Sequence, residues 1–406
     1  MNNKKLQLWH KILIGLVLGL IAGIIVGPGI TVLKPFGTLF INLLKMMIVP
    51  LLVLFLVAGA ASITDIKKLG RVGGKIVGMY LLTTFIAVSI GIVFALIIQP
   101  GTGVEIEKPA EVKGKEAPSI VSWLVDIVPK NVIKAMSESR VLQIIFFSLF
   151  LGICLALVGE PAKPVIEIFE ILSQAMVKMV HIVMEYAPYA VFALMAWVAG
   201  KYGLKMMLPL GKLIITVYLA CAIHIIVVYG FIVKVLGKRP LGWFFKGGAN
   251  AMAVAYSTAS SAATLPATME CSEKNHGVSK TVFGFSLPLG ATINMDGTST
   301  YQAICAIFTA QLFGIDLSLY HYMAIILTGT LASIGAAGVP GAGLIMLTMV
   351  LTAAGLPLEA IGIIAGVDRI MDMFRTMTNV TGDMAVTLAV ARTEGELEEL
   401  AESAAS

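Results

Sequence analysis

The sequence predicts an all-α protein that crosses a membrane several times, and two observations lead to this fold class. Of the 406 residues, 58% are hydrophobic and 13% are charged, whereas soluble domains average about 45–50% and about 25%. The apolar residues also gather in runs close to the length of about 20 residues that a membrane-spanning helix requires. This composition excludes a disordered chain, a secreted disulfide scaffold and an ordinary cytosolic enzyme.

Six apolar runs in the first 240 residues are predicted to span the bilayer as helices. The first follows Lys4, Lys5 and Lys11 and has no small-residue cleavage site, so we expect a transmembrane helix rather than a signal peptide. Basic residues gather after the second run and after the sixth, which predicts that these loops and the amino terminus are cytoplasmic. The runs are Ile12–Val26, Phe36–Ala61, Gly73–Ile98, Val141–Val158, Val165–Val198 and Leu208–Leu236.

Beyond Pro240 the apolar segments are interrupted in the middle. Trp243–Cys271 is broken between Tyr256 and Pro266, and Tyr320–Gly355 is broken between Ser333 and Gly343. Each segment is too interrupted for one straight span, and each half is too short to cross alone. We therefore predict two re-entrant helical hairpins. Their unwound tips are candidate binding elements, because irregular backbone at membrane depth is tolerated only inside protein or beside a watery cavity.

A short internal repeat supports this organisation. Ala262–Pro266 and Ala336–Pro340 share the pattern A-A-x-x-P, and each is followed by a polar helix. Asn294–Thr298 and Asn379–Asp383 share N-x-x-G followed by an oxygen-bearing residue. Paired interruptions at corresponding places of two halves indicate an inverted-repeat transporter with a binding site at the bilayer midplane.

The last predicted helix, Leu358–Val390, carries Asp368, Arg369, Asp372, Arg375 and Asp383, although each charge at the centre of a membrane helix costs about 2.5–3.5 kcal/mol. At about 100° per residue, one face roughly 100° wide holds a polar stripe. The stripe consists of Asp372, Arg375, Thr376, Asn379 and Asp383. A structural salt bridge of Arg375 with Asp372 or Asp368 is the simpler interpretation, but it leaves Thr376 and Asn379 unexplained.

The functional interpretation assigns a ligand to this stripe. The planar guanidinium of Arg375 suits a carboxylate, and Asp372 can accept an ammonium group. Hydroxyl and amide groups can then orient a second carboxylate. A ligand with two carboxylates and one amine is an acidic amino acid.

A cation site is predicted at Asn294–Thr298, where Gly297 weakens the helix and an unwound turn would expose carbonyl oxygens beside polar side chains. Discontinuous membrane helices supply the oxygen ligands that Na⁺ prefers. Asp383 could serve a second cation, and Tyr80, Thr83 and Thr84 could add oxygens, with a simple helix-backbone contact as the alternative for the two threonines.

Several other residue types carry no site on sequence grounds. His181 and His224 lie in apolar runs and are interpreted as packing residues, and the four cysteines stand alone. The basic residues lie beside apolar runs rather than among aromatic side chains, which excludes nucleic acid as a partner. No organic cofactor is expected.

Four motifs in one order resemble the dicarboxylate/amino acid:cation symporter family, and in particular its prokaryotic glutamate and aspartate transporters. They are Ser260–Pro266, Asn294–Thr298, Ser333–Gly343 and Asp372–Asp383. The resemblance implies a homotrimer in the cytoplasmic membrane, with a fixed scaffold, a transport domain that moves like an elevator, and two hairpins that act as gates.

The resemblance also implies a division of the chain. Residues 1–72 would hold scaffold helices one and two; 73–118 the third helix, in the transport domain, and an extracellular loop; 119–164 a fourth helical region for scaffold and trimer; 165–203 the fifth helix, in the scaffold; 204–240 the sixth helix, in the transport domain; 241–277 hairpin one; 278–318 a broken seventh helix; 319–356 hairpin two; 357–393 the eighth helix; and 394–406 a solvated acidic tail.

By the same resemblance, Arg375 would bind the side-chain carboxylate of the substrate and Asp372 its amine. The rest of the implied substrate site is Ser260, Ser261, Thr298, Val339, Gly343, Thr376 and Asn379. Sodium would bind at three places: Asp383 with carbonyls of Gly290, Asn294 and Asn379; Thr292 and Met295 with Ser333, Ile334 and Ala336; and Asn294, Asp296, Thr83 and Thr84 with the Tyr80 carbonyl.

The chain departs from the family pattern at the position of one arginine. Ala259 stands where archaeal members carry it and Met373 where animal members carry it, and Arg369 is the nearest substitute. Gln302 occupies the place of a glutamate in proton-coupled animal members, which favours sodium without proton cotransport.

The leading hypothesis is therefore a sodium-coupled symporter of aspartate or glutamate, and not an enzyme. The alternatives are a proton-coupled C4-dicarboxylate carrier or a neutral amino acid symporter of the same family, an ion channel, and an intramembrane protease that uses Asp296 and Asp383. A catalytic aspartate pair would have to share a proton, which the NxDGT context and the nearby arginine do not suit.

Overall fold

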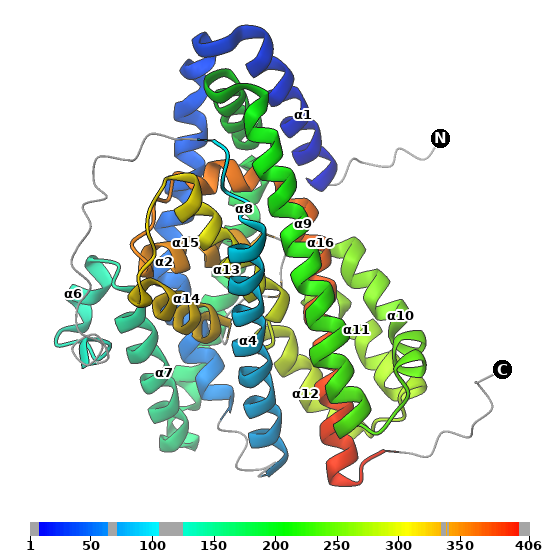
Figure 1. Cartoon of the computed structure of the whole chain (residues 1–406). Coiled ribbons are helices and arrows are strands. Elements are labelled where there is room, and N and C mark those ends of the chain that lie inside the picture. The colour runs from blue at the N-terminus through cyan, green and yellow to red at the C-terminus, as the bar shows by residue number, and fades with distance from the viewer. Residues whose placement is uncertain (1–7, 64–70, 105–124, 334–337, 339–340, 398–406) are drawn as a thin grey trace, which may run out of the picture.

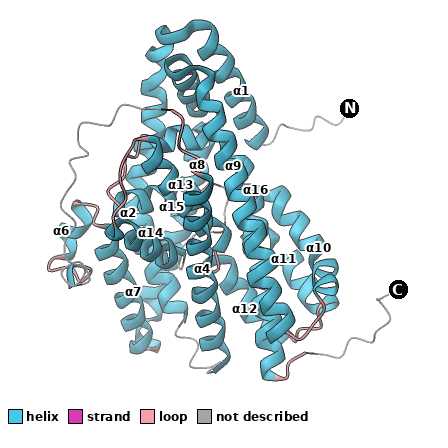
Figure 2. Cartoon of the chain, in the orientation of Figure 1, coloured by secondary structure: helices cyan, strands magenta, loops and turns pink. Residues whose placement is uncertain are grey.

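The computed structural model describes residues 8–63, 71–104, 125–333, 338 and 341–397, and every regular element in these residues is helical (Figures 1 and 2). One isolated β-bridge joins Val278 to Leu397. The predicted all-helical class is therefore confirmed. The elements are α1 (Leu8–Val26), η1 (Gly27–Leu33), α2 (Lys34–Ile63), α4 (Arg71–Ile98), α6 (Val132–Ser137), α7 (Val141–Val158), η2 (Glu160–Ala162), α8 (Lys163–Tyr202), η3 (Gly203–Met206), α9 (Met207–Ile223), η4 (His224–Tyr229), η5 (Ile232–Leu236), α10 (Leu241–Thr258), α11 (Ser261–Glu270), η6 (Cys271–Asn275), α12 (Lys280–Ile293), α13 (Asp296–Leu312), α14 (Leu319–Ala332), α15 (Ala342–Ala353) and α16 (Ala360–Glu394).

Among the described residues, five helical stretches are long and apolar enough to cross a membrane. They are His10–Ala61, Val72–Ile98, Val141–Val158, Glu160–Tyr202 and Met207–Leu236. The first stretch contains two of the six predicted runs, because the short helix η1 joins α1 to α2. All six apolar runs are therefore helical, as predicted.

The helices form two packing groups. In the first group, α1, α2, α7 and α8 pack on one another. Small residues allow the close approach of α1 to α8: a Cβ atom on Gly15 or Gly19 would lie 2.5 Å from a carbonyl oxygen of α8. Small residues spaced four apart are the usual means by which membrane helices approach closely.

The second group surrounds α13 and α16, which are buried along most of their length. Helices α4, α9, α10, α12 and α15 all pack against one or both of them (Figure 1). The polar stripe of α16 consequently faces protein on every side. A helix with such a stripe is stable in this position only if neighbouring helices satisfy its polar groups.

The first predicted hairpin is a pair of helices, α10 and α11, joined by only two residues. Ala259 has the left-handed conformation, with φ +51°, and Ser260 is extended and accepts a hydrogen bond from the Ala263 N–H at 3.2 Å. The predicted interruption from Tyr256 to Pro266 was therefore too long. Because Ser260 caps α11, the helix begins directly after it and includes Pro266.

Helices α14 and α15 form the second pair, and α12 and α13 are separated at Asn294 and Met295, as predicted. Gly297 lies in the first turn of α13 rather than in the break itself. Glycine is required there, since a Cβ atom would lie 2.7 Å from the Cα atom of Arg375. The N-x-x-G motif thus combines a helix break with a close contact to α16.

The beginning of the acidic tail is not solvated, contrary to the prediction. Glu394 ends α16 and forms an ion pair with Lys75 of α4. The Ser279 N–H donates a hydrogen bond to the Glu396 carbonyl at 3.0 Å. These contacts attach the end of α16 to the beginnings of α4 and α12.

Candidate functional site

A buried cluster of acids and bases lies on α16. Arg375 is fully buried; its Nε donates to Asp372 Oδ1 at 2.9 Å and its Nη1 donates to Asp368 Oδ1 at 2.7 Å. Arg369 approaches the other oxygen of Asp372, with Nη1 and Oδ2 3.5 Å apart. Two carboxylates and two guanidinium groups therefore balance one another in this substrate cluster, which we define as Asp368, Arg369, Asp372 and Arg375.

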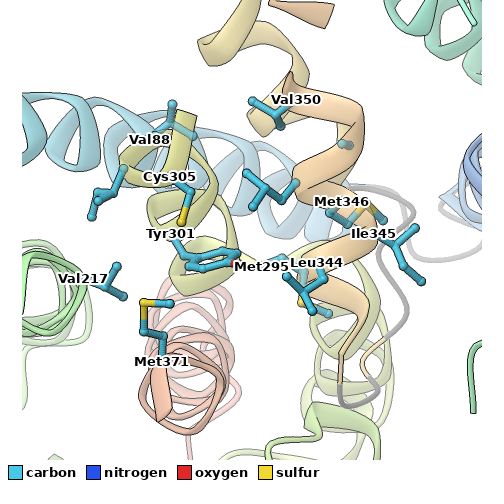
Figure 3. Packing of buried hydrophobic residues seen from close by; sticks show 14 of the residues in the cluster. Val88, Val217, Met295, Tyr301, Cys305, Leu344, Ile345, Met346, Val350 and Met371 are labelled. Carbon is cyan, nitrogen blue, oxygen red and sulfur yellow. The ribbon is translucent and has the colours of Figure 1, made fainter. Parts of the chain in front are cut away.

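The guanidinium of Arg375 also lies against an aromatic ring, with its Cζ 4.2 Å from the Tyr301 ring centroid. Figure 3 shows Tyr301 between Met371 of α16 and Leu344 of α15. A cation over an aromatic face is stabilised by the ring quadrupole. Tyr301 did not enter the predicted site, and the pairing of Arg375 with Asp368 entered only through the salt-bridge interpretation, whose ion pairs are present here. Asp368 could have been included, because it lies seven residues before Arg375 on the same face of the helix.

The second helix pair approaches this cluster through a glycine. A Cβ atom on Gly343 would overlap the guanidinium of Arg375, because it would lie 2.5 Å from Arg375 Cζ. The Gly341 N–H also donates a hydrogen bond to Asp372 Oδ2 at 3.2 Å. The second tip, which was predicted to close over the ligand, therefore lies directly against Arg375 and Asp372.

A cavity of about 20 Å³ lies where both helix-pair tips meet the stripe. Most of the predicted substrate residues line it, and Val339 lies outside the described residues. The lining residues are Ala259, Ser261, Met295, Thr298, Gly338, Ala342, Gly343, Met346, Asp372, Thr376 and Asn379. This space holds about one water molecule, so the site is closed to a ligand of amino-acid size.

Ser260, which was predicted to contact ligand, joins the two helix-pair tips in this structure. Its hydroxyl donates to the Gly338 carbonyl at 2.7 Å, and the Ala262 N–H donates to the same oxygen at 3.1 Å. A Cβ atom on Gly338 would lie 2.6 Å from the Ala291 carbonyl oxygen, so this contact also requires glycine. The two tips are therefore joined directly.

The two N-x-x-G motifs contact each other reciprocally. The Asn294 amide donates to Asp383 Oδ1 at 2.9 Å and to the Asn379 carbonyl at 3.2 Å. In return, Asn379 accepts from the Gly297 N–H at 2.8 Å and donates to the Thr298 hydroxyl at 3.2 Å. The repeated motif therefore supplies two side-chain amides, of Asn294 and Asn379. Their hydrogen bonds connect the break between α12 and α13 to α16.

On the other side of this pair lies a second group of buried polar residues. Thr84 donates its hydroxyl to Asp296 Oδ1 at 2.6 Å, and it also contacts the Tyr80 carbonyl at 2.8 Å. Thr83 bonds the same carbonyl at 3.0 Å and reaches Asn294 Oδ1 at 3.5 Å. The helix-backbone contact considered for these threonines exists, and so does their contact with the NxDGT motif.

Asp383 belongs to the same group, and Gly290 allows its approach. A Cβ atom on Gly290 would lie 2.6 Å from the Tyr80 hydroxyl and 2.9 Å from Asp383 Cγ. We define the cation cluster as Tyr80, Thr83, Thr84, Gly290, Asn294, Asp296 and Asp383. Its members were predicted as ligands of two sodium sites, and the fold brings them together.

The cation cluster contains two buried carboxylates, and the described residues place no lysine or arginine beside them. Within the described part of the chain, neither Asp296 nor Asp383 pairs with a lysine or arginine; their partners are Thr84, Tyr229, His224 and Asn294. A buried charge without a counter-charge is strongly destabilising. An oxygen-rich, negatively charged space is the environment in which a hard cation binds.

The remaining predicted sodium set is not assembled by the described residues. Thr292 is exposed and donates its hydroxyl to the Leu289 carbonyl at 2.9 Å, while Ser333 donates to the Thr330 carbonyl at 2.6 Å. Ile334 and Ala336 lie outside the described residues. Met295 is buried, with its sulfur 3.2 Å from the Asn379 amide nitrogen.

A larger cavity of about 200 Å³ lies between the two packing groups. One wall belongs to the first group, with residues such as Ile12, Phe40 and Met184, and the other contains Arg369 and Asp372. Because Asp372 lines both cavities, the larger one borders the closed site.

A bundle of apolar helices that encloses a cluster of buried charges is typical of a multi-pass membrane transporter. The chain belongs to the sodium:dicarboxylate symporter family, whose profile matches residues 8–393. It is 38% identical to the proton/sodium-glutamate symport protein of Geobacillus stearothermophilus, over 98% of this chain and 96% of that protein. It is 36% identical both to the proton/glutamate-aspartate symporter of Escherichia coli, over 97% and 94%, and to a C4-dicarboxylate transport protein of Rhodospirillum rubrum, over 96% and 89%.

Proposed function

We propose that this chain is a sodium-coupled symporter of acidic amino acids, aspartate or glutamate. The observation that carries the proposal is the adjacency of two unlike clusters. A charge-balanced Arg375–Asp372 pair lies next to two buried carboxylates, Asp296 and Asp383, that contact no lysine or arginine among the described residues, and the Asn294–Asn379 pair connects the two groups. The first cluster suits a zwitterion with an additional carboxylate, and the second suits a cation that enters with it.

In the proposed complex Arg375 binds the side-chain carboxylate of the substrate and Asp372 binds its amine. Ser261, Thr298, Thr376 and Asn379 orient the main-chain carboxylate, and they all line the closed cavity. Gly343 and Val339 would cover the ligand. Arg375 and Asp372 are paired with each other in this structure, so the substrate carboxylate and amine would each replace one partner of an existing ion pair.

Substrate access requires movement of the helix-pair tips. A cavity of about 20 Å³ does not accommodate an amino acid, and the Gly338 carbonyl is bound by two donors from the other tip. Separation of α14 and α15 from α11 would open the site toward the larger cavity that Asp372 also lines. We propose that both helix pairs are re-entrant hairpins and act as gates.

Coupling follows from the shared amides. Asn379 reaches Thr298 in the substrate cavity, and its carbonyl accepts from Asn294, which also donates to Asp383. A sodium ion beside Asp383 would neutralise that carboxylate and hold Asn294 and Asn379 in place. Since linkage is reciprocal, substrate would increase the affinity for sodium by the same factor.

The two packing groups support an elevator mechanism in a homotrimer. The group of α1, α2, α7 and α8 would be the scaffold, and the group around α13 and α16 would carry the site. We propose eight spans in the cytoplasmic membrane, with the amino terminus in the cytoplasm.

The test is uptake into proteoliposomes. We expect radiolabelled aspartate or glutamate to accumulate when an inward sodium gradient is imposed, at equal pH on both sides. Accumulation that ignores sodium but follows an imposed proton gradient would overturn the proposed coupling.

A second candidate is transport of C4-dicarboxylates, and one observation favours it. Arg375, Arg369 and the Gly341 N–H already surround the Asp372 carboxylate, which leaves little of it for a substrate amine. Thermal stabilisation by succinate or fumarate equal to that by aspartate would select this candidate, because a ligand raises the melting temperature only if it binds.

A further inference from the structure

A π-helical turn lies directly beside the cation cluster. The turn η4 runs from His224 to Tyr229 within the long helical stretch that begins at Met207. Its first and last residues meet the same atom: His224 Nε2 lies 3.0 Å from Asp296 Oδ2, and the Tyr229 hydroxyl donates to Asp296 Oδ2 at 2.8 Å. All three side chains are fully buried.

The π-helical geometry makes this double contact possible. In a regular α-helix, residues five apart are separated by about 140° around the axis and face different neighbours. In a π-helical turn the backbone bonds join residues five apart, as the Gly230 N–H does with the Ile225 carbonyl, so such residues share a side. The His224 and Tyr229 rings consequently meet edge to face, with centroids 4.7 Å apart.

Different donors contact the two carboxylate oxygens of Asp296. A carboxylate only accepts hydrogen bonds, so the imidazole hydrogen lies on His224 Nε2, and Nδ1 has no partner among the described residues. Oδ2 thus accepts two hydrogen bonds. In the same part of the chain, Oδ1 accepts only the Thr84 hydroxyl, which lies beside the Tyr80 carbonyl.

We propose that this π-helical turn is a positioning device for sodium coupling. His224 and Tyr229 hold Oδ2 so that Oδ1 of Asp296 faces the cation together with the Tyr80 carbonyl. The inference rests on the proposed function and assigns two positioning residues to it. Neither residue lines the closed substrate cavity, so their effect should be on sodium and not on direct contact with substrate.

Sodium titration of aspartate binding to the purified full-length protein tests this inference. His224→Leu removes one donor, and His224→Gln keeps an amide donor at a similar reach. We expect His224→Leu to raise the half-saturating sodium concentration on the order of 10-fold, since a hydrogen bond to a buried charged group is lost. Aspartate affinity at saturating sodium should change by less than about twofold, and His224→Gln should restore most of the sodium affinity.

Tyr229→Phe should act in the same direction, because it removes the second donor to Oδ2. Tyr218→Phe is the matched control: Tyr218 lies on the same helical stretch but donates to the Ile370 carbonyl at 2.9 Å, outside the cation cluster. Its sodium curve should be unchanged.

A wild-type sodium curve for both His224→Leu and Tyr229→Phe would overturn the inference while the proposed function stands. Equal loss in His224→Leu and His224→Gln would overturn it as well, because a donor role requires rescue by glutamine. Binding of aspartate by the wild-type protein without any dependence on sodium would overturn the proposed function itself. If His224→Leu does not fold, the comparison of Tyr229→Phe with Tyr218→Phe still decides.

Discussion

The substrate cluster and the cation cluster lie on either side of the same asparagine pair, yet they treat buried charge in opposite ways. Asp368 and Asp372 are each within 3 Å of a guanidinium nitrogen of Arg375. Asp296 and Asp383 are as deeply buried, and the described residues offer them only hydroxyl, amide and imidazole groups.

This difference indicates which cluster depends on a ligand. In a buried ion pair, the attraction between the charges roughly balances the cost of desolvating them, whereas an unpaired buried charge costs several kcal/mol. The charges of the substrate cluster therefore balance one another without a ligand, whereas the carboxylates of the cation cluster require an added positive charge. Removal of charge should have opposite effects in the two places.

The largest expected effect is that of Arg375→Ala. It leaves Asp368 and Asp372 buried without a base, which should cost about 3–5 kcal/mol of folding stability. Aspartate affinity should fall at least 100-fold, because the bidentate partner of the substrate carboxylate is lost. Isothermal titration and thermal unfolding measure the two effects. Arg375→Lys, which retains the charge without the planar guanidinium, is the control, and its aspartate affinity and stability should lie between those of the wild type and the alanine variant. Near-native aspartate binding by Arg375→Ala would refute the assignment.

Asp383→Asn should have the opposite effect on stability. In sodium-free buffer the variant should unfold at a higher temperature than the wild type, since it removes a buried charge without a counter-charge. The same change should raise the half-saturating sodium concentration roughly 10-fold or more, because a charged ligand becomes neutral. Thermal unfolding in sodium and in choline buffer separates the effect on stability from the effect on sodium binding. If Asp383→Asn were less stable than the wild type in choline, the Asp383 carboxylate would already be stabilised without sodium. The two clusters would then not differ in charge balance.

A steric test follows on α12, which carries two glycines in different surroundings. A Cβ atom on Gly290 would meet Asp383 and the Tyr80 hydroxyl, but one on Gly284 would meet nothing within 4 Å. Gly290→Ala should cost about 1–3 kcal/mol and weaken sodium binding, as overpacking does. Gly284→Ala should be neutral or slightly stabilising. Equal melting temperatures for the two variants would mean that the cation cluster is loosely packed.

The smallest effect is expected for Ala259→Gly. Ala259 has φ +51° at the tip that borders the substrate cavity. Since left-handed backbone costs a non-glycine residue about 1–2 kcal/mol, partly offset by the greater freedom of glycine when unfolded, we expect a gain of about 0.5–1 kcal/mol. Denaturant unfolding measures it. The sodium titration should not change, because Ala259 does not touch the cation cluster.

Much of this site could be predicted from local sequence. The spacing of Asp372, Arg375, Thr376 and Asn379 placed them on one face of α16, and all four are buried and lie beside or in the closed cavity. The break at Asn294 and Met295 also followed from the sequence, since polar residues and glycine interrupt an apolar run there. These features depend on helical periodicity and hydrophobicity, which act over neighbouring residues.

Other parts could not be predicted. His224 was interpreted as a packing residue, because a single histidine in an apolar run carries no local pattern, and only the π-helical turn brings it and Tyr229 to Asp296. Ser260 was expected to contact ligand, but it caps α11 and binds the Gly338 carbonyl. Its partner lies 78 residues away in the chain.

By itself the sequence determined that this protein is a helical membrane protein, where its helices are interrupted, and which face of α16 is polar. Only the tertiary structure decided which charges balance one another. Among the described residues, Arg375 is paired with two carboxylates whereas Asp296 and Asp383 have no lysine or arginine partner, and this difference arises where α4, α9, α13 and α16 meet. Electrostatic balance depends on distances in space between residues remote in sequence, and helical periodicity does not set those distances.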